Sequence, residues 1–402
     1  MDIDRANFVS RLVDILEAIS EAHFVSFDLE LSGVPVGSRT NKASSGKQTL
    51  SQRYQEVKAA AEKFQILQIG LTCVKEDVQA GKYLLRPYNI NLSPVIEERL
   101  DVDRTFSFHS GAVDFLNSVS FDFQQPFASG VPYLSRDETL LALQRAQVRH
   151  DRDRDAIPEI DIKPEDTKSL ELLRRVRAHI AEWAGTGEVF QGALTVDATF
   201  LDDERQSRPD AELSSFERRL VHQLVRSEYP KLITISKRGT IQIIPLDQER
   251  EDRFRRERKR DAYRRIEQAT GFRWIVEALC GSDPRGIDIG WWTVNPEYGV
   301  STFHDRDELE ARMYRIDHRL RGKPRVLVGH NMFLDLVYLY RTFIGPLPDS
   351  VEGFQEAINE LFPMIVDTKY LATHNGGNVS SMSTLQQTAQ QVEHQPRPIV
   401  GM

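Results

Sequence analysis

The sequence has only two cysteines, Cys73 and Cys280, among 402 residues. Two thiols are too few for the disulfide framework that stabilises small secreted domains, or for a site in which cysteines hold a zinc ion. Such sparing use is typical of a reducing compartment, where an isolated cysteine behaves as a small buried apolar residue. The sequence therefore predicts an intracellular protein whose stability comes from packed cores.

Long hydrophobic runs are also lacking. No apolar stretch approaches the roughly 20 residues that a membrane-spanning helix needs. The first twenty residues do not resemble a secretory signal, because Asp2 and Asp4 stand at the start and apolar residues then recur at helical spacing from Phe8 to Ile19. This pattern predicts an amphipathic helix in a soluble protein with no membrane partner.

An excess of positive charge is lacking as well. The chain has 52 Lys and Arg against 60 Asp and Glu, a net charge of -8. This balance argues against a surface coated uniformly with nucleic acid, but it allows a local basic groove beside an acidic site. At 46.1 kDa and 40% hydrophobic residues, the chain is long enough to predict two or more domains with packed cores.

Hydrophobic periodicity predicts a mixed α/β domain in the first part of the chain. Apolar runs at 23–31, 64–74 and 82–88 indicate strands, and 110–118 is typical of a helix. Residues 36–51, rich in Gly, Ser, Thr, Asn and Lys, indicate a surface loop. Strands in close succession followed by helices favour a mixed sheet covered by helices.

A small inserted domain is predicted next. Residues 134–166 grow densely charged toward their end and indicate an exposed connection. Helical patterns at 168–184 and 213–227 follow, and then two short apolar runs at 232–244 flank Lys237-Arg238-Gly239. This order is typical of a compact α+β unit.

The last part of the chain returns to the strand-and-helix pattern. A strongly basic helix at 250–265 has two open interpretations: a solvated connector, or a segment that faces phosphates or directs nuclear import. The stretch 283–320 ends in another charged helical run. Residues 325–340 and 363–372 each predict a strand that leads into a helix.

Asp28 and Glu30 are two residues apart inside an apolar strand, so both side chains project from one face. Two carboxylates there repel each other unless a cation lies between them. Oxygen ligands without cysteine favour Mg²⁺ or Mn²⁺ over zinc. The alternative is an edge strand whose acids are in solvent.

Asp335 lies in an otherwise apolar helix, after the strand at 325–329 and the turn His330–Asn331. An acid near a helix start either caps the helix or is available as a ligand. Asn331 is better placed as the cap, and this leaves Asp335 as a third candidate metal ligand.

Together these segments resemble the poly(A)-specific ribonuclease family, deadenylases with an Asp-Glu-Asp-Asp exonuclease fold. The blocks that resemble the family, in order, are NFVSRLVDILEAISEAHFVSFDLELSGV, FQILQIGLTCV, AVDFLNSVSFDF, SGVPYL, VLVGHNMFLDL and PMIVDTKYLA. The resemblance implies an RNase-H-like mixed sheet flanked by helices. It also implies a 3′-exoribonuclease that trims poly(A) or other single-stranded RNA ends and releases 5′-AMP, a possible homodimer, and a nuclear or cytoplasmic location.

In that family four acids hold two Mg²⁺ ions, one activating water and the other stabilising the leaving 3′ oxygen. By resemblance, Asp28 and Glu30 match the first two ligands and Asp335 the third. Asn331 and Lys369 match positions that contact the RNA backbone.

Leu31 departs from the family's usual Phe, which implies a weaker stacking surface for the terminal base. In the inserted unit, Arg218 and His222 are one helical turn apart and match the Arg-x-x-x-His signature of a single-strand nucleic-acid-binding domain. The alternative for this pair is a surface ion pair with a neighbouring acid.

The resemblance divides the chain into a nuclease domain at 1–166 and 247–402 and an inserted domain at 167–246. In the family, a later segment supplies a His as general base and the fourth acid, and the chain is expected to stop before it, at Met402. Neither His374 nor His394 has a matching context.

Asp367 is expected to be structural. Two hypotheses therefore stay open: an active 3′-exoribonuclease, or a catalytically impaired RNA-binding relative that lacks the fourth acid and the general base.

Overall fold

The computed structural model describes residues 1–35, 48–151, 159–184, 192–200, 212–281, 306–374, 384–392 and 399–401. The chain divides into two compact units, one formed by Met1–Ala146 with Ala262–Met402 and the other by Gln147–Asp261. Parts of the sequence interpretation lie outside the described residues, namely 36–47 of the predicted loop, residues 282–305 and His394. None of the described helices is both long and apolar enough to cross a membrane.

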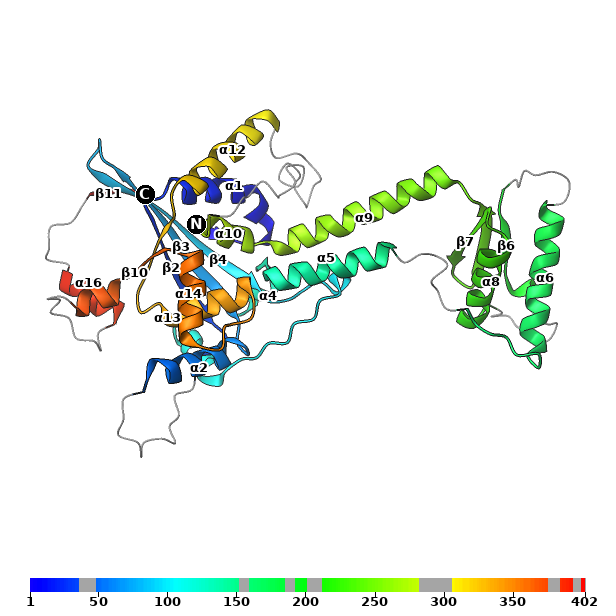
Figure 1. Ribbon diagram of the computed structural model, residues 1–402, viewed down its shortest axis with the longest axis horizontal. Helices are drawn as coiled ribbons and strands as arrows, with labels where there is room; N and C mark the ends of the chain where they lie inside the picture. Colours follow the sequence, from blue (N-terminus) through cyan, green and yellow to red (C-terminus); the bar gives the residue numbers. More distant parts are fainter. Residues whose placement is uncertain are drawn as a thin grey trace. The chain divides into compact units, whose positions relative to one another are not determined.

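A mixed sheet forms the centre of the first unit (Figure 1). Within the described residues its main path is β1 (Asp2–Ile3), β4 (Lys82–Ser93), β3 (Ile66–Asp77), β2 (Phe24–Leu31), β9 (Val326–Gly329) and β10 (Met364–Asp367), with β5 (Val131–Pro132) and β11 (Ile399–Gly401) also paired to β4. Strand β3 is antiparallel to both neighbours, whereas β2, β9 and β10 are parallel. The predicted mixed sheet flanked by helices is confirmed.

Helices cover the sheet on both sides. Helix α1 packs with α10 and α12, whereas α2 packs with α13 and α14, and Figure 1 shows the two groups on opposite sides of the strands. The helices of this unit are α1 (Arg5–Glu21), α2 (Leu50–Ala61), α3 (Ser110–Ser118), α4 (Gln124–Ala128), α10 (Arg273–Leu279), α12 (Arg306–Gly322), α13 (Phe333–Leu339), α14 (Val351–Leu361), α15 (Thr368–Thr373) and α16 (Leu385–Val392), with α5 (Arg136–Asp151) and α9 (Gln248–Thr270) continuing into the other unit.

Local sequence explains where the first elements begin and which way they face. Asp4 caps α1 through a reciprocal pair of hydrogen bonds with Asn7, so the helix starts at Arg5. In β2, the buried Phe27 and Leu29 alternate with Asp28. Because successive side chains in a strand point to opposite faces, packing of the apolar set fixes the direction of the acids.

The parallel strands bring distant segments to one edge of the sheet. Ser26 of β2 pairs with Val328 of β9, and Gly329 of β9 pairs with Asp367 of β10. The carboxyl ends of these three strands therefore lie together, and this is the edge at which ligands bind in open α/β sheets.

The second unit has its own core. Helices α6 (Thr167–Ala184) and α8 (Ser215–Glu228) contact each other, and α8 also packs on a three-stranded sheet of β6 (Leu194–Val196), β8 (Thr240–Pro245) and β7 (Leu232–Lys237). Buried residues of this core include Val176, Val221 and Ile241. The predicted helices and strand pair are present, whereas nucleic-acid binding by this unit stays a prediction.

Two expectations about connections are wrong. The first half of the predicted connection at 134–166 is helix α5, because Ala142 and Ala146 pack into a small core. The predicted loop at 36–51 extends too far, because Thr49 caps α2 and the helix begins at Leu50. In both places, burial and capping override a polar composition.

Candidate active site

Strand β2 presents the first two acids near its carboxyl end. Asp28 is exposed and Glu30 is half-buried on the same side of the strand. Burial raises the pKa of Glu30, and the negative charge of Asp28 raises it further. The two carboxylates therefore repel each other, as their spacing predicts.

Asp335 joins them from the first turn of α13. Burial raises the pKa of Asp335 to about 7, with further contributions from the charges of Asp28, Asp367 and Glu30. Acids that are far apart in the sequence thus act on one another through space. The fold brings Asp28, Glu30 and Asp335 into one acidic group at the carboxyl edge of the sheet.

Asn331 does not cap α13 as the sequence suggested. The residue before the helix is Met332, and no side chain caps it. Asn331 instead takes a left-handed conformation with φ of 60°, which asparagine tolerates better than most residues, in the turn after β9. Asp335 is not the cap either, so its carboxylate stays a candidate metal ligand.

The carboxylate of Asp367 stabilises this turn through hydrogen bonds. It accepts hydrogen bonds from the backbone N–H groups of Asn331, Met332, Lys369 and Tyr370 at 2.8–3.2 Å. Burial tends to raise the pKa of Asp367, but these four bonds lower it on balance. They give Asp367 the structural role expected from the sequence, because one carboxylate both caps α15 and holds the start of α13.

His330 was overlooked in the sequence. Thr368 donates its hydroxyl proton to the Gly329 carbonyl at 3.0 Å, so the Nδ1–H of His330 donates to the Thr368 oxygen, also at 3.0 Å. The other ring nitrogen, Nε2, is buried and has no hydrogen-bond partner among the described residues. The position of His330 between a strand end and a helix start was the available signal.

The oxygen atoms of the acidic group are suitable ligands for a hard cation, but the side chains are too far apart to hold one as they stand. Asp28, Glu30 and Asp335 offer only oxygen, the ligand type preferred by Mg²⁺. Burial, and then the charge of Asp28, raises the pKa of both Glu30 and Asp335, and a bound cation would favour their ionised forms. In the described part of the chain, however, no three acidic, His or Cys side chains are close enough to hold an ion as they stand. A metal would have to draw these carboxylates together, and the Asp28 side chain is exposed.

The predicted RNA-contacting residues flank the same edge. Asn331 is exposed and Lys369 is half-buried in the first turn of α15. Leu31 is only 7% exposed and packs in the core, so it offers no stacking surface for a base. His374 stacks on Tyr370, with ring centroids 4.2 Å apart, at the end of α15.

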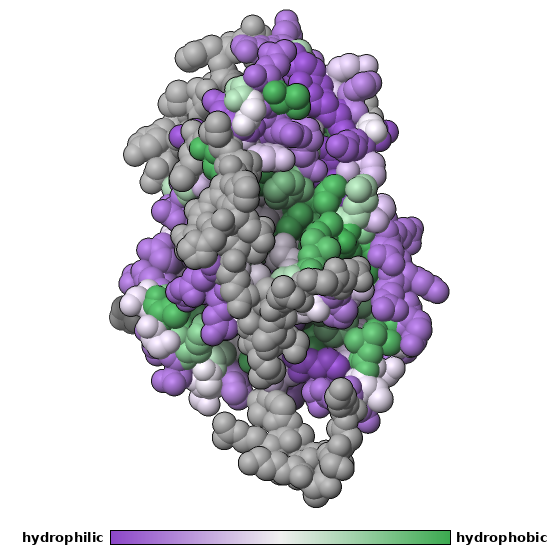
Figure 2. Space-filling model, turned by 90° about the vertical axis from the view of Figure 1, so that its left-hand side faces the viewer, coloured by the Kyte–Doolittle hydropathy of each residue, from purple (hydrophilic) through white to green (hydrophobic). Residues whose placement is uncertain are grey.

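Hydrophobic side chains reach the surface beside these polar groups. Met364, Tyr370 and Leu371, on β10 and α15, are each 45–61% exposed. Figure 2 shows hydrophobic residues gathered on the surface, in the view from the left-hand side of Figure 1.

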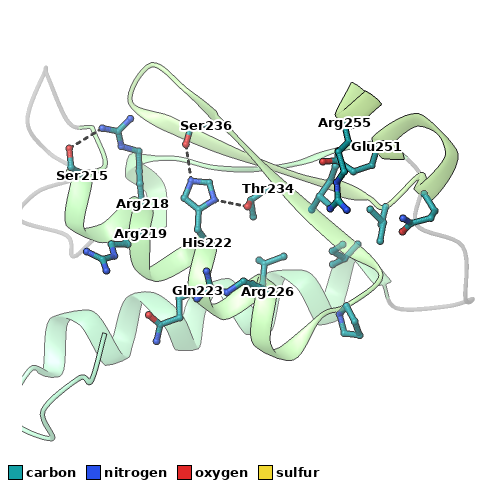
Figure 3. Close-up of a pocket in the computed structure, with 16 residues that line it drawn as sticks. Ser215, Arg218, Arg219, His222, Gln223, Arg226, Thr234, Ser236, Glu251 and Arg255 are labelled. Carbon is teal, nitrogen blue, oxygen red and sulfur yellow. Dashed lines mark hydrogen bonds between the residues drawn. The ribbon is translucent and has the colours of Figure 1, made fainter. Parts of the chain in front are cut away.

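The Arg-x-x-x-His pair lies on α8 in the second unit (Figure 3). The ring nitrogens of His222 contact the hydroxyls of Thr234 at 2.5 Å and Ser236 at 2.7 Å. Burial lowers the pKa of His222, and Arg218 lowers it further. Arg218 donates to the Ser215 hydroxyl at 3.2 Å, and its buried Nε has no partner among the described residues.

Acids gathered at the carboxyl edge of a mixed sheet flanked by helices place the chain in the class of α/β proteins with a polar site at that edge. The chain belongs to the CAF1 family ribonucleases, because the model of that family matches residues 3–399. The resemblance to poly(A)-specific ribonucleases seen in the motifs is also confirmed by the relatives.

Poly(A)-specific ribonuclease PARN of Xenopus laevis is 26% identical over 93% of this chain and 52% of its own length. The pre-piRNA 3′-exonuclease trimmer of Bombyx mori is 26% identical over 92% of this chain and 58% of its own length. The chain thus spans about half the length of the curated relatives it matches. The solved structure of S. pombe Pop2p in its Mg²⁺ and Mn²⁺ bound form covers 60% of this chain and 96% of that chain at 16% identity, with a TM-score of 0.23 that is too low to support an argument.

Proposed function

We propose that this protein is a 3′-exoribonuclease that trims poly(A) or other single-stranded RNA ends and releases 5′-AMP. The observation that carries the proposal is the parallel pairing of β2 with β9, which brings Asp28 and Glu30 of β2 to the same edge of the sheet as the helix that carries Asp335. Membership of a ribonuclease family and similarity to proteins named as poly(A)-specific ribonucleases support the same activity.

The three acids are proposed to hold Mg²⁺, two ions in all by the family pattern. When bound, the ions would lower the pKa of a water molecule and stabilise charge on the leaving 3′ oxygen. Asp335 must lose its proton to act as a ligand, and with a pKa of about 7 it does so near neutral pH. Asp367 contributes by fixing the turn between β9 and α13 through its hydrogen bonds to Asn331 and Met332.

RNA is proposed to bind at two places. Near the acids, Lys369 supplies a positive charge and Asn331 an exposed amide for the RNA backbone. In the second unit, Arg218 supplies a guanidinium for a phosphate while His222 orients the site. Phosphate contacts of this kind provide most of the affinity for single strands and make it sensitive to salt.

A homodimer is the partner state that the family resemblance implies. Light scattering of the purified chain tests it directly. A mass near twice 46.1 kDa supports the dimer, and a mass near 46.1 kDa contradicts it.

The activity is tested by a time course of end-labelled oligo(A) with Mg²⁺. We expect stepwise shortening from the 3′ end with release of AMP. Asp28→Ala should reduce the rate by roughly 10²-fold or more, because a ligand of the ions is lost. Glu76→Ala is the matched control, since Glu76 is an exposed acid on β3 that takes no part in the acidic group, and its rate should equal that of the wild type.

If the wild type binds oligo(A) but does not shorten it, the second hypothesis of a catalytically impaired RNA-binding relative is favoured. If Asp28→Ala shortens oligo(A) as fast as the wild type does, the assignment of the acidic group as the active site is wrong. Repeating the assay with Ca²⁺ or a chelator in place of Mg²⁺ separates a metal requirement from RNA binding, because binding through Arg218 needs no ion.

A further inference from the structure

The first unit contains a cavity of about 340 Å³ beside the start of α1. Its lining residues come from the first turns of α1, from the segments that follow β4 and β5, and from the last turns of α9. None of the lining residues belongs to the acidic group or to the second unit, so the cavity is separate from both sites described above.

The walls of this cavity are mostly apolar, because it lies at the boundary between two hydrophobic cores. Phe8 is 3% exposed in the main core of the unit, and Leu134 is 1% exposed in a smaller core that also includes Ile266. Val95, another lining residue, is 52% exposed and therefore accessible to a ligand. Apolar groups of a ligand gain free energy when such walls remove them from water.

Two arginines accompany the apolar walls. Arg5 is exposed and donates through Nε to the Gly130 carbonyl at 3.3 Å. Arg265 lines the cavity and forms no hydrogen bond or ion pair within the described part of the chain. Glu97 is the one carboxylate among the lining residues, and it pairs with Arg99 at 3.8 Å. The local charge therefore favours an acidic ligand, although the net charge of the chain is -8.

The walls do not suit a nucleic acid. Phe8 and Tyr133 are the aromatic residues of the lining, and neither is more than 3% exposed, so neither offers a face on which a base can stack. The Tyr133 hydroxyl is also occupied, because it donates to the side chain of Gln65 at 2.9 Å. A peptide suits the walls better, since one peptide can supply both apolar side chains and a carboxylate.

We propose that this cavity is a docking site for a short peptide segment of a partner protein, in which bulky apolar side chains are next to an acidic residue. The apolar side chains pack between Phe8 and Leu134 and against Val95, and the carboxylate pairs with Arg265. The side-chain amide of Gln268, which has no hydrogen-bond partner among the described residues, is available to the peptide backbone. This docking site goes beyond the proposed function, because it requires neither RNA nor the acidic group.

The first experiment selects random eight-residue peptides displayed on phage for binding to the full chain, and in parallel to Arg265→Glu. The wild type should enrich peptides that combine leucine or an aromatic residue with aspartate or glutamate. Because Arg265→Glu reverses the charge of the wall, it should enrich peptides in which lysine or arginine replaces the acid. Arg264→Glu is the matched control, since Arg264 is an exposed neighbour on α9 that does not line the cavity, and it should enrich the same peptides as the wild type.

The second experiment measures fluorescence polarisation of the peptide that the wild type enriches most. Val95→Asp and Arg265→Glu should each weaken binding by roughly tenfold or more, because one disrupts the apolar contact and the other the charge pair. Val78→Asp is the control for Val95→Asp, since Val78 is 77% exposed and does not line the cavity. It should bind as the wild type does. Circular dichroism of each variant checks that the helices are intact.

Four results would overturn the proposal. The first is a selection without enrichment, or with enriched peptides that lack acidic residues. The second is equal weakening by Arg264→Glu and Arg265→Glu, which would show an effect of overall charge. The third is displacement of the peptide by oligo(A), which would show that the cavity binds RNA. The fourth is a mass by light scattering that falls by half in Val95→Asp, which would show that a second copy of the chain covers the cavity.

Discussion

Asp335 is the acid whose ionisation is most costly in the candidate site. Its pKa of about 7 in the folded chain compares with 3.8 for an exposed aspartate. Between these pH values the folded chain binds more protons at this position than the unfolded chain does, so stability falls as pH rises. The contribution of Asp335 is complete below about pH 3.8 and is lost as pH passes 7.

Asp335→Asn should remove this pH dependence. In metal-free protein we expect the variant to be more stable than the wild type at pH 8 by roughly 2–4 kcal/mol, because each pKa unit is worth about 1.4 kcal/mol. The difference should shrink toward pH 5. Urea unfolding in chelator at several pH values measures it, with Glu76→Gln as an exposed control that should follow the wild type. Equal curves for wild type and Asp335→Asn would show that Asp335 titrates normally.

Arg104 and Glu138 form a largely buried charge pair that is held by several hydrogen bonds. The guanidinium donates twice to Glu138, at 2.9 and 2.5 Å, and also to the carbonyls of Pro94 and Tyr133. The side chain of Arg104 is 9% exposed. Burial opposes ionisation of Glu138, but its contacts with Arg104 lower its pKa on balance.

Glu138→Ala should therefore be strongly destabilising, by about 3–5 kcal/mol, because it leaves the Arg104 charge buried without its partner. Chemical denaturation measures the change. The matched control is Glu97→Ala, which breaks the exposed pair with Arg99 at 3.8 Å and should change stability by less than about 1 kcal/mol. A small effect at Glu138 would mean that water replaces the carboxylate.

At the scale of elements, two strand-to-helix turns share one carboxylate. Asp367 ends β10, caps α15 and binds the backbone of the turn after β9. The acidic group is therefore positioned by a residue that need not take part in chemistry.

Asp367→Ala should cost about 1–3 kcal/mol in unfolding free energy, since a helix cap and two further backbone bonds are lost. Asp367→Asn keeps an oxygen acceptor and should recover part of the loss. Asp349→Ala is the control, because the exposed Asp349 contributes only a surface pair with Lys58. Thermal unfolding of the three variants makes the comparison, and a loss at Asp349 equal to that at Asp367 would contradict the argument.

The sequence predicted the strands and helices of this site better than the turns that connect them. The alternation of apolar and acidic residues around Asp28 predicted strand β2 and the side of the strand on which the acids lie. The apolar run before His330 predicted β9 and the helix after it. The capping role assigned to Asn331 was wrong, because the turn is held by Asp367, and β10, which carries it, pairs with β9 only in the folded sheet. Pairing of Ser26 with Val328 could not be read from local pattern, since register between distant strands depends on tertiary packing. The predicted roles in metal and RNA binding stay predictions.

At the scale of the whole molecule, the chain has separate cores in its two units. Leu16 is fully buried in the first unit and Ile243 is fully buried in the second. Because each core is contiguous within its own unit, each unit can open without the other.

Ile243→Ala should therefore lower protection from hydrogen exchange in α6, α8, β7 and β8 by about 2–4 kcal/mol, and leave the main sheet unchanged. Leu16→Ala should do the reverse, and thus serves as the reciprocal control. Native-state exchange followed by mass spectrometry reads both units in one experiment. A uniform loss of protection across the chain in either variant would show a single cooperative unit.

The order of the strands along the chain determines when the acidic group can form on the nascent chain. A ribosome releases the N-terminal segments first. Strand β2 therefore emerges with Asp28 and Glu30 long before β9, its parallel neighbour, has been synthesised, and the whole second unit is made in between. Until the segment that carries Asp335 leaves the exit tunnel, the three carboxylates cannot meet. Whatever reaction they perform together is thus withheld until that segment has been made, while the nascent chain is still attached next to its own messenger RNA.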